Sequence, residues 1–376
     1  MQQAINSETP RVLVADDQMH VREALQMLLS AEGFHTLSVS SPDNVMAALA
    51  AQPFDLVLMD LNYARDTTSG REGLDLVERI RSVDSNLPLV AMTGWATIDL
   101  TVTAMKTGFC DFILKPWDNG KLIETIKREV RNGRVKRRAA RDVAEARHIQ
   151  QTLLPRTLPT LRGWNIAADW KPANDVGGDY FDVIPLSDTR LGICMADVAG
   201  KGLSAALLMS NLQGLLRTVA RDSVAPSEVC ARLNRMLCKV LDGGRFVTLF
   251  YGVLDAGSRA FTWCNAGHNP ALLHQRGASS WLSDGGIVLG LIPDASFTEQ
   301  WVRIDADARL LLYTDGITEA EDEFGMPFGE DRLIASLAQH RDATAAAIRD
   351  RLFASVSGFC HGRFRDDAAL MVVAAD

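Results

Sequence analysis

Residues 174–209 decide the architecture of the second half of this chain: NDVGGDYFDV at 174–183 and LGICMADVAGKGLSAALLM at 191–209. Each stretch joins a run typical of a β-strand to acidic residues, Asp179 and Asp182 in the first and Asp197 in the second. Carboxylates beside glycine-rich turns offer the oxygen ligands that Mg²⁺ and Mn²⁺ prefer. Two further acidic turns, YTDG at 313–316 and RDDA at 365–368, predict that four loops meet at one metal site.

Length and composition limit the number of domains and the class of protein. A chain of 376 residues suggests two or three domains. A net charge of −8 argues against general nucleic-acid binding, and the six cysteines show no CxxC pair, which is typical of reduced thiols. The N-terminal segment has no apolar core of a secretion signal, and no apolar run reaches roughly 18 residues. We therefore expect a cytoplasmic protein without a membrane span.

The first part of the chain, residues 9–126, alternates short apolar runs with segments of helical period. The runs at 11–15, 54–59, 87–92 and 111–114 each end in polar residues. This alternation predicts a doubly wound α/β fold with a parallel sheet, whose functional groups lie at the carboxyl ends of the strands. The groups at these strand ends are Asp16, Asp17, Asp60, Thr93 and Lys115. Any one of them alone could be a solvated loop residue. Together they predict a Mg²⁺ site, because clustered carboxylates repel one another without a cation.

Residues 9–126, which follow an N-terminal tail at 1–8, resemble the receiver domain of two-component response regulators. The resemblance implies that a histidine kinase or phosphotransfer protein phosphorylates Asp60. It also implies a Mg²⁺ site formed by Asp16, Asp17, Asp60 and the backbone carbonyl of Asn62, and a switch formed by Thr93, Phe112 and Lys115. The polar segment 63–71 is longer than the loop that usually follows the phosphorylated residue.

Residues 127–155 are expected to form a helical connector. Helical sequence runs from Lys121 to Gln151, and residues 127–147 are rich in Arg and Lys. A basic helix can bind nucleic acid, but no helix-turn-helix follows and no aromatic residues are interleaved, so we expect no nucleic-acid partner. Apolar residues at spacings of three, four and seven predict a short coiled coil, and hence a homodimer through residues 119–155. These residues are Val135, Ala139, Val143, Ala146 and Leu153.

Residues 156–376 predict a mixed α/β sandwich, with packed sheets and the helices outside. The strand-like runs are 164–171, 180–186, 191–197, 246–254, 260–265, 272–275, 300–304, 309–313 and 368–374. Helical period appears at 203–220, 226–241, 332–339 and 343–357. The acidic residues that border glycines or strand ends are Asp179, Asp197, Asp315 and Asp366. An aspartate at such a junction can also cap a helix or form an Asx turn, but four of them favour a binuclear hydrolytic centre.

The motifs GGDYFD, DVAGKG, NAGHNP, YTDGITEA and FRDDAAL resemble the PPM/PP2C family, specifically the bacterial SpoIIE/RsbU-like serine phosphatases. The resemblance implies two Mn²⁺ or Mg²⁺ ions, bridged by Asp197 and further bound by the Val198 carbonyl, Asp315, Asp366 and Asp179. Asp182 and Asp367 would not bind the metals but would contact and orient the residues that do. It also implies that the helix from about residue 202 is a switch element.

Two features depart from the broader family. Ala199 stands where a histidine is usual, so the acid for the leaving group is unassigned, and Lys171 and Lys201 are the only candidates for a phosphate-binding cation. His268 is a catalytic candidate, although a histidine in such a turn is more often structural. The GGDYF segment also resembles the diguanylate cyclase signature, but it lies near the start of the domain and leaves the TDG and RDD turns unexplained.

Together these resemblances imply a response-regulator phosphatase. Its expected substrate is a phosphoserine or phosphothreonine protein, such as a STAS-type anti-anti-sigma factor in a partner-switching stress response. The alternative is a non-catalytic adaptor that binds a sigma factor or its regulator. A third hypothesis is a regulator that binds DNA through the basic connector. The sequence does not specify whether phosphorylation of Asp60 activates or inhibits. It also does not specify the cognate kinase, the identity of the substrate or the geometry of the dimer.

Overall fold

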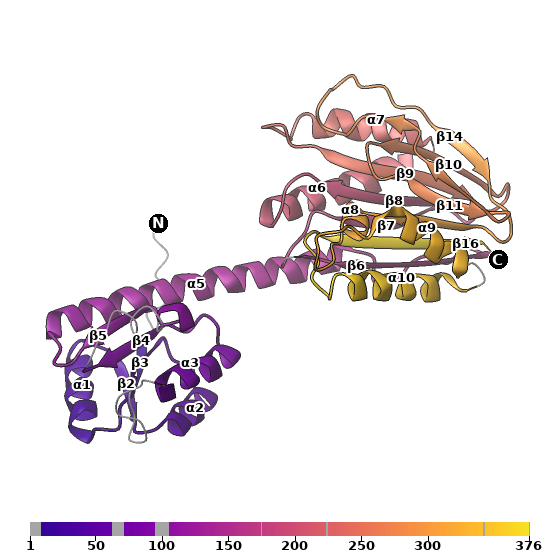
Figure 1. Ribbon diagram of the computed structural model, residues 1–376. Helices are drawn as coiled ribbons and strands as arrows, with labels where there is room; N and C mark the ends of the chain where they lie inside the picture. The colour runs from indigo at the N-terminus through magenta and orange to yellow at the C-terminus, as the bar shows by residue number, and fades with distance from the viewer. Residues whose placement is uncertain are drawn as a thin grey trace. The chain divides into compact units, whose positions relative to one another are not determined.

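The computed structural model describes residues 9–61, 71–94, 105–173, 175–222, 225–340 and 343–375 (Figure 1). Contacts between residues divide the chain into two compact units, 1–142 and 143–376. The limit expected between receiver and connector, at 126/127, falls inside one continuous helix. Among the described helices, none is both long and apolar enough to cross a bilayer.

The first unit has a five-stranded parallel sheet in the order β2-β1-β3-β4-β5. Its strands are β1 (Arg11–Ala15), β2 (His35–Val39), β3 (Leu56–Asp60), β4 (Leu89–Thr93) and β5 (Asp111–Leu114). The described helices are α1 (Met19–Ala31), α2 (Pro42–Ala51), α3 (Arg71–Val83) and α5 (Asn119–Leu153). The prediction of a doubly wound parallel sheet is confirmed.

Alternate residues of each strand face opposite sides of this sheet and build two cores. One face packs against α2 and α3, and the other against α1 and the start of α5. In β1, for example, Leu13 and Ala15 join the first core, whereas Val12 and Val14 join the second. Because both faces are covered, the inner strands β1, β3 and β4 are apolar between their ends, whereas the edge strand β2 (HTLSV) carries polar residues along its length.

The long helix α5 stays in close contact with the first unit well beyond its first turns. A Cβ atom on Gly133 would lie only 2.3 Å from Cγ of Pro88, so this position has no space for a side chain. A glycine in a helix usually costs stability, and here it allows the helix to lie against the loop before β4.

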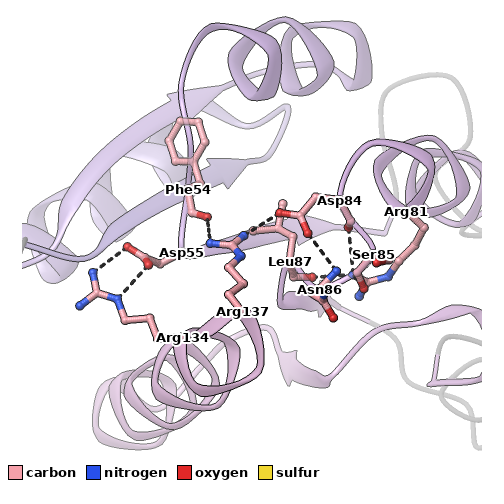
Figure 2. Close-up of polar contacts among 9 residues, drawn as sticks. All are labelled: Phe54, Asp55, Arg81, Asp84, Ser85, Asn86, Leu87, Arg134 and Arg137. Atoms are coloured by element: carbon pink, nitrogen blue, oxygen red, sulfur yellow. Dashed lines mark hydrogen bonds and ion pairs between the residues drawn. The ribbon is translucent and has the colours of Figure 1, made fainter. Parts of the chain in front are cut away.

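Two arginines of α5 extend this contact (Figure 2). Arg134 donates from Nε and Nη2 to the two carboxylate oxygens of Asp55, at 2.8 and 2.9 Å. Arg137 donates to Asp84 at 2.8 Å and to the carbonyl oxygen of Phe54 at 2.7 Å. Both acids lie in loops that lead into β3 and β4, so the basic character of this helix segment serves contacts inside the unit.

The second unit contains two largely antiparallel sheets. The first has the order β13-β10-β9-β8-β7, with β14 also paired to β10: β7 (Tyr180–Ser187), β8 (Arg190–Val198), β9 (Val247–Asp255), β10 (Ala260–Ala266), β13 (Gly285–Gly286) and β14 (Gln300–Arg303). The second has the order β12-β11-β15-β16-β6: β6 (Trp164–Lys171), β11 (Ala271–Gln275), β12 (Ala278–Leu282), β15 (Arg309–Tyr313) and β16 (Ala368–Ala375).

The sheets pack face to face, and helices cover their outer faces (Figure 1). Helices α6 (Leu203–Asp222) and α7 (Pro226–Leu237) lie on the first sheet. Helices α9 (Gly329–Gln339) and α10 (Ala345–Phe359) lie on the second, and the short α8 (Asp315–Thr318) follows β15. This is the α/β sandwich predicted from the sequence.

Candidate functional sites

The first candidate site lies at the carboxyl edge of the parallel sheet. Asp16 follows β1, while Asp60 and Thr93 end β3 and β4, and Lys115 follows β5. Lys115 Nζ lies 2.5 Å from Asp16 Oδ2 and 2.7 Å from Asp60 Oδ2. The structure thus brings together residues that are up to 99 positions apart in the sequence.

Three carboxylates gather here closely enough to share one cation. Ligand oxygens of Asp16, Asp17 and Asp60 all lie within 4.8 Å of one another. Burial lowers the pKa of Lys115, but the hydrogen bonds that Lys115 donates to Asp16 and Asp60, together with their negative charge, outweigh burial and place the pKa above its usual value. The site therefore combines a fixed positive charge with an all-oxygen donor set, which is the ligand type that Mg²⁺ takes.

The remaining predicted receiver residues differ in environment. Thr93 is buried at the end of β4, and Phe112 is partly exposed on β5. Asn62, together with the long polar segment up to residue 70, lies outside the described residues.

The second candidate site lies where two strand pairs of the sandwich meet. Asp179 precedes β7 and Asp197 stands near the end of β8, and these strands are antiparallel. Asp315 follows β15 and Asp366 precedes β16, which are antiparallel as well. The start of one strand and the end of its partner share an edge, so each pair contributes two acids at one end.

Hydrogen bonds connect the two edges. Thr314 Oγ1 donates to Asp179 Oδ2 at 2.6 Å and accepts from the backbone N–H of Ala369 at 2.8 Å. Asp367 Oδ2 accepts from the backbone N–H of Gly178 at 2.8 Å. The loop that carries Asp179 is therefore fixed to β15 and β16 of the opposite sheet.

Glycines make this convergence possible. A Cβ atom on Gly178 would lie 2.8 Å from the Val198 carbonyl oxygen and 3.1 Å from Asp197 Oδ1. A Cβ atom on Gly316 would lie 1.9 Å from the carbonyl oxygen of Asp367. Neither position can hold a side chain, so both glycines bring the acidic loops into contact.

The clustered carboxylates disfavour their own ionisation. Burial, followed by repulsion from Asp197, holds the pKa of Asp179 well above its usual value. Burial, followed by repulsion from Asp315 and Asp366, raises the pKa of Asp197 to about 7. Burial and then Asp366 also raise the pKa of Asp315. A bound divalent cation would remove this repulsion.

The donor set fits a centre with more than one ion. Four carboxylates and the Val198 carbonyl all offer oxygen atoms, the ligand type that Mn²⁺ and Mg²⁺ prefer. Across the described part of the chain, three acidic ligand atoms within 4.8 Å of one another occur only at the receiver trio. No three described acids of the second cluster meet this distance.

The two candidate phosphate-binding lysines lie in different environments. Lys201 Nζ is 2.7 Å from Asp366 Oδ2 and also donates to the Arg365 carbonyl at 3.3 Å, with an exposed side chain. Lys171, at the end of β6, lies over the ring of Phe364, with Nζ 4.6 Å from its centroid. Lys201 is the one that directly contacts the acidic cluster.

Asp182 and His268 have structural partners instead. Asp182 is fully buried and accepts from Arg217 of α6, at 2.6 and 3.1 Å, and from the Tyr180 hydroxyl at 2.7 Å. His268 is buried, its Nε2 donates to the Tyr313 carbonyl at 3.1 Å and its Nδ1 contacts Thr248 at 2.8 Å. Burial lowers the pKa of His268 to about 4, so the imidazole is neutral and joins strands of the two sheets.

Sequence reasoning missed three residues that position these groups. Thr314 was visible only as the residue before an acidic turn, and Arg217 only as one arginine of an amphipathic helix. Gln150 is buried at the end of α5 and bonded to Gly177. It interrupts the apolar stripe between Ala146 and Leu153, and a polar residue at such a position is a recognisable signal.

Comparisons with known proteins agree with this division. Residues 187–376 match the model of Stage II sporulation protein E (SpoIIE), and residues 12–127 match the response regulator receiver domain. The chain is 31% identical over 260 residues to protein IcfG of Synechocystis sp., covering 61% of this chain and 41% of that protein. It is 28% identical over 234 residues to the phosphoserine phosphatase RsbU of Bacillus subtilis, covering 62% of this chain and 69% of that protein.

A solved structure supports the same relation. The RsbU and RsbW domains of Rv1364c from Mycobacterium tuberculosis match with a TM-score of 0.51 and 26% identity, covering 59% of this chain and 63% of that one. The chain thus spans less than half of IcfG and about two thirds of RsbU.

Proposed function

The chain belongs to the SpoIIE family, whose model matches just over half of its length, and we propose that it is a metal-dependent protein serine/threonine phosphatase under the control of its receiver domain. The observation that carries this proposal is the convergence of Asp179, Asp197, Asp315 and Asp366 from four strand ends, joined by Thr314 and Asp367. When bound, two divalent ions would activate a water molecule and screen the phosphate charge.

The chain's own residues would hold and orient this centre. Asp197 and the Val198 carbonyl, together with Asp315 and Asp366, provide oxygen ligands, and Asp179 completes the set. Thr314 uses its hydroxyl on one oxygen of Asp179 and so leaves the other oxygen for a cation. Asp367 holds the loop before Asp179.

A rigid turn beside the cluster favours a protein as substrate. Its base is tied to the acidic loop by an ion pair of Glu321 with Arg365. Asp322 accepts backbone hydrogen bonds from Phe324 and Met326, both at 2.9 Å. Yet these two side chains are 82% and 60% exposed. Two neighbouring apolar side chains exposed on one turn beside the cluster would give a protein substrate an apolar surface to bind.

At the receiver, we propose that Asp60 accepts a phosphoryl group from a histidine kinase or phosphotransfer protein, with Mg²⁺ held by Asp16 and Asp17. Lys115 would then contact the phosphoryl group, and Thr93 and Phe112 would respond to it. The connector, through residues 119–155, would carry this change and form a homodimer; exposed Val135 on α5 supports the dimer.

We propose a phosphorylated STAS-type anti-anti-sigma protein as the substrate. The support is the similarity to the phosphoserine phosphatase RsbU, together with the apolar turn beside the acidic cluster. Dephosphorylation would free such a protein to bind an anti-sigma factor, as in a partner-switching stress response.

The test is Mn²⁺-dependent phosphate release from p-nitrophenyl phosphate by the wild type and by Asp315→Ala, with and without beryllofluoride on Asp60. We expect the substitution to lower the rate by about a hundredfold or more, because a metal ligand is lost. The sign of the beryllofluoride effect gives the direction of the switch. No release in any state, including with a phosphorylated STAS protein, would favour the non-catalytic adaptor instead.

A further inference from the structure

Gln150 is a buried polar residue near the end of the connector helix. Its side chain is only 2% exposed, and a buried amide is costly unless its groups are bonded. Nε2 donates to the carbonyl oxygen of Gly177 at 2.6 Å, and Oε1 accepts from the N–H of the same residue at 3.1 Å. One side chain thus binds both polar backbone groups of one residue in the loop before Asp179.

The opposite side of this loop is confined by the acidic cluster. A Cβ atom on Gly177 would lie 2.0 Å from Asp367 Oδ2, the oxygen that accepts from Gly178. Gly178 in turn abuts the Val198 carbonyl and Asp197. The two residues before Asp179 therefore lie between the connector helix and the acidic residues, with no room for side chains on the cluster side.

The end of α5 also contacts α6. Gln213 Nε2 donates to the Leu153 carbonyl at 3.2 Å, less than one helical turn beyond Gln150. The pair of Arg147 and Asp175, at 3.5 Å, adds an exposed and weaker contact. The last turn of α5 is therefore held both to the Asp179 loop and to the helix that follows Asp197.

We propose that Gln150 is a positioning residue of the metal site: its paired hydrogen bonds to Gly177 fix the main chain that leads to Asp179, so the end of the connector determines where this carboxylate stands. The proposal rests on the function proposed above. A displacement of α5 must either carry Gly177 with it or break both bonds, because hydrogen bonds weaken steeply beyond normal distances.

The test compares Gln150→Met with Gln151→Met in the full chain. Methionine keeps the length of the side chain and removes its amide, and Gln151 is an exposed neighbour on the same helix, so it is a matched control. Amide hydrogen exchange of residues 175–182 is followed first without metal and then during a Mn²⁺ titration, and the Mn²⁺ concentration that gives half of the protection is recorded. Hydrolysis of p-nitrophenyl phosphate is measured in parallel.

We expect Gln150→Met to speed exchange in residues 175–182 about tenfold and to raise the Mn²⁺ midpoint by about three- to tenfold, while Gln151→Met behaves like the wild type. An unchanged Mn²⁺ midpoint would overturn the proposal, even with faster exchange, because the contact would then serve only the fold. An equal shift in both variants, or wild-type protein that Mn²⁺ fails to protect, would overturn it as well. Protection by Mn²⁺ without phosphate release would count against the phosphatase and leave the positioning role supported.

Discussion

The receiver cluster and the phosphatase cluster are both built from aspartates at strand ends, but they balance their charge differently. In the receiver, Lys115 reaches between Asp16 and Asp60 and its side chain is only 16% exposed. In the second unit, among the described contacts, the lysine paired with the cluster is Lys201, whose side chain is 58% exposed and whose partner Asp366 is itself 42% exposed.

This difference shows how a fold can keep acids together without metal. Lys115 places a positive charge between Asp16 and Asp60 within the protein itself, so the receiver site is preformed. The second cluster has no such internal cation among the contacts described, and burial and mutual repulsion raise the pKa values of Asp179 and Asp197 instead, that of Asp197 to about 7. The first site is therefore expected to tolerate metal removal, whereas the second couples metal binding to proton release.

The largest effect is expected from removing the internal cation of the receiver. Lys115→Met removes the positive charge that pairs with the buried carboxylates of Asp16 and Asp60, so we expect the free energy of unfolding of this unit to fall by about 3 kcal/mol. Mg²⁺ should restore part of the loss, because it supplies the missing charge. Hydrogen exchange of β1 and β3 in increasing urea would measure this. The matched control is Lys127→Met, which removes an exposed ion pair with Glu32 and should cost less than about 1 kcal/mol.

A smaller effect is expected from pH at the phosphatase site. Since the pKa of Asp197 is raised to about 7, the metal-free folded unit keeps a proton that the unfolded chain loses near pH 4. Its free energy of unfolding should therefore fall as pH rises from about 4 to 7. Mn²⁺ must displace this proton. The Mn²⁺ concentration that gives half of the protection should therefore rise by about tenfold for each pH unit below 7 and be constant above pH 7. The measurement is the protection of residues 175–182 from hydrogen exchange. A Mn²⁺ midpoint that is constant from pH 5.5 to 8 would show that metal binding at the second cluster does not release a proton.

The smallest effect is expected at Lys201. Because its positive charge opposes a cation near Asp366, Lys201→Ala should lower the Mn²⁺ midpoint, but by no more than about threefold, as exposed pairs contribute little. Lys239→Ala, which removes an exposed lysine after α7, is the control. A higher Mn²⁺ midpoint in Lys201→Ala would mean that Lys201 helps to build the metal site. Lys201 would then act on its acidic cluster as Lys115 does in the receiver.

The sequence predicts the fold well where strands alternate or are fully apolar. The runs at 164–171 and 309–313 coincide with β6 and β15. The pattern missed β12, whose residues ASSWL are mostly exposed at a sheet edge and carry no alternation. It also extended the helix from Pro226 to residue 241, although α7 ends at Leu237.

The acidic residues of both sites could be found from the sequence because a strand end is a local feature. Their supporting contacts could not, because these depend on tertiary pairing. Thr314 reaches Asp179 across 135 residues, and Arg217 reaches Asp182 across 35 residues from a different element. No local pattern specifies which threonine or arginine makes such a contact.

The close fit of α5 against the first unit bears on how the chain can be divided and recombined. The receiver match ends at residue 127, yet Gly133, Arg134 and Arg137 still contact the loops before β3 and β4. A sensor cassette cut at residue 127 would leave Asp55 and Asp84 without their arginines. A transplantable cassette should therefore extend to Asp142, and a chimera that joins a foreign receiver to residues 143–376 should bring that receiver's own helix extension with it.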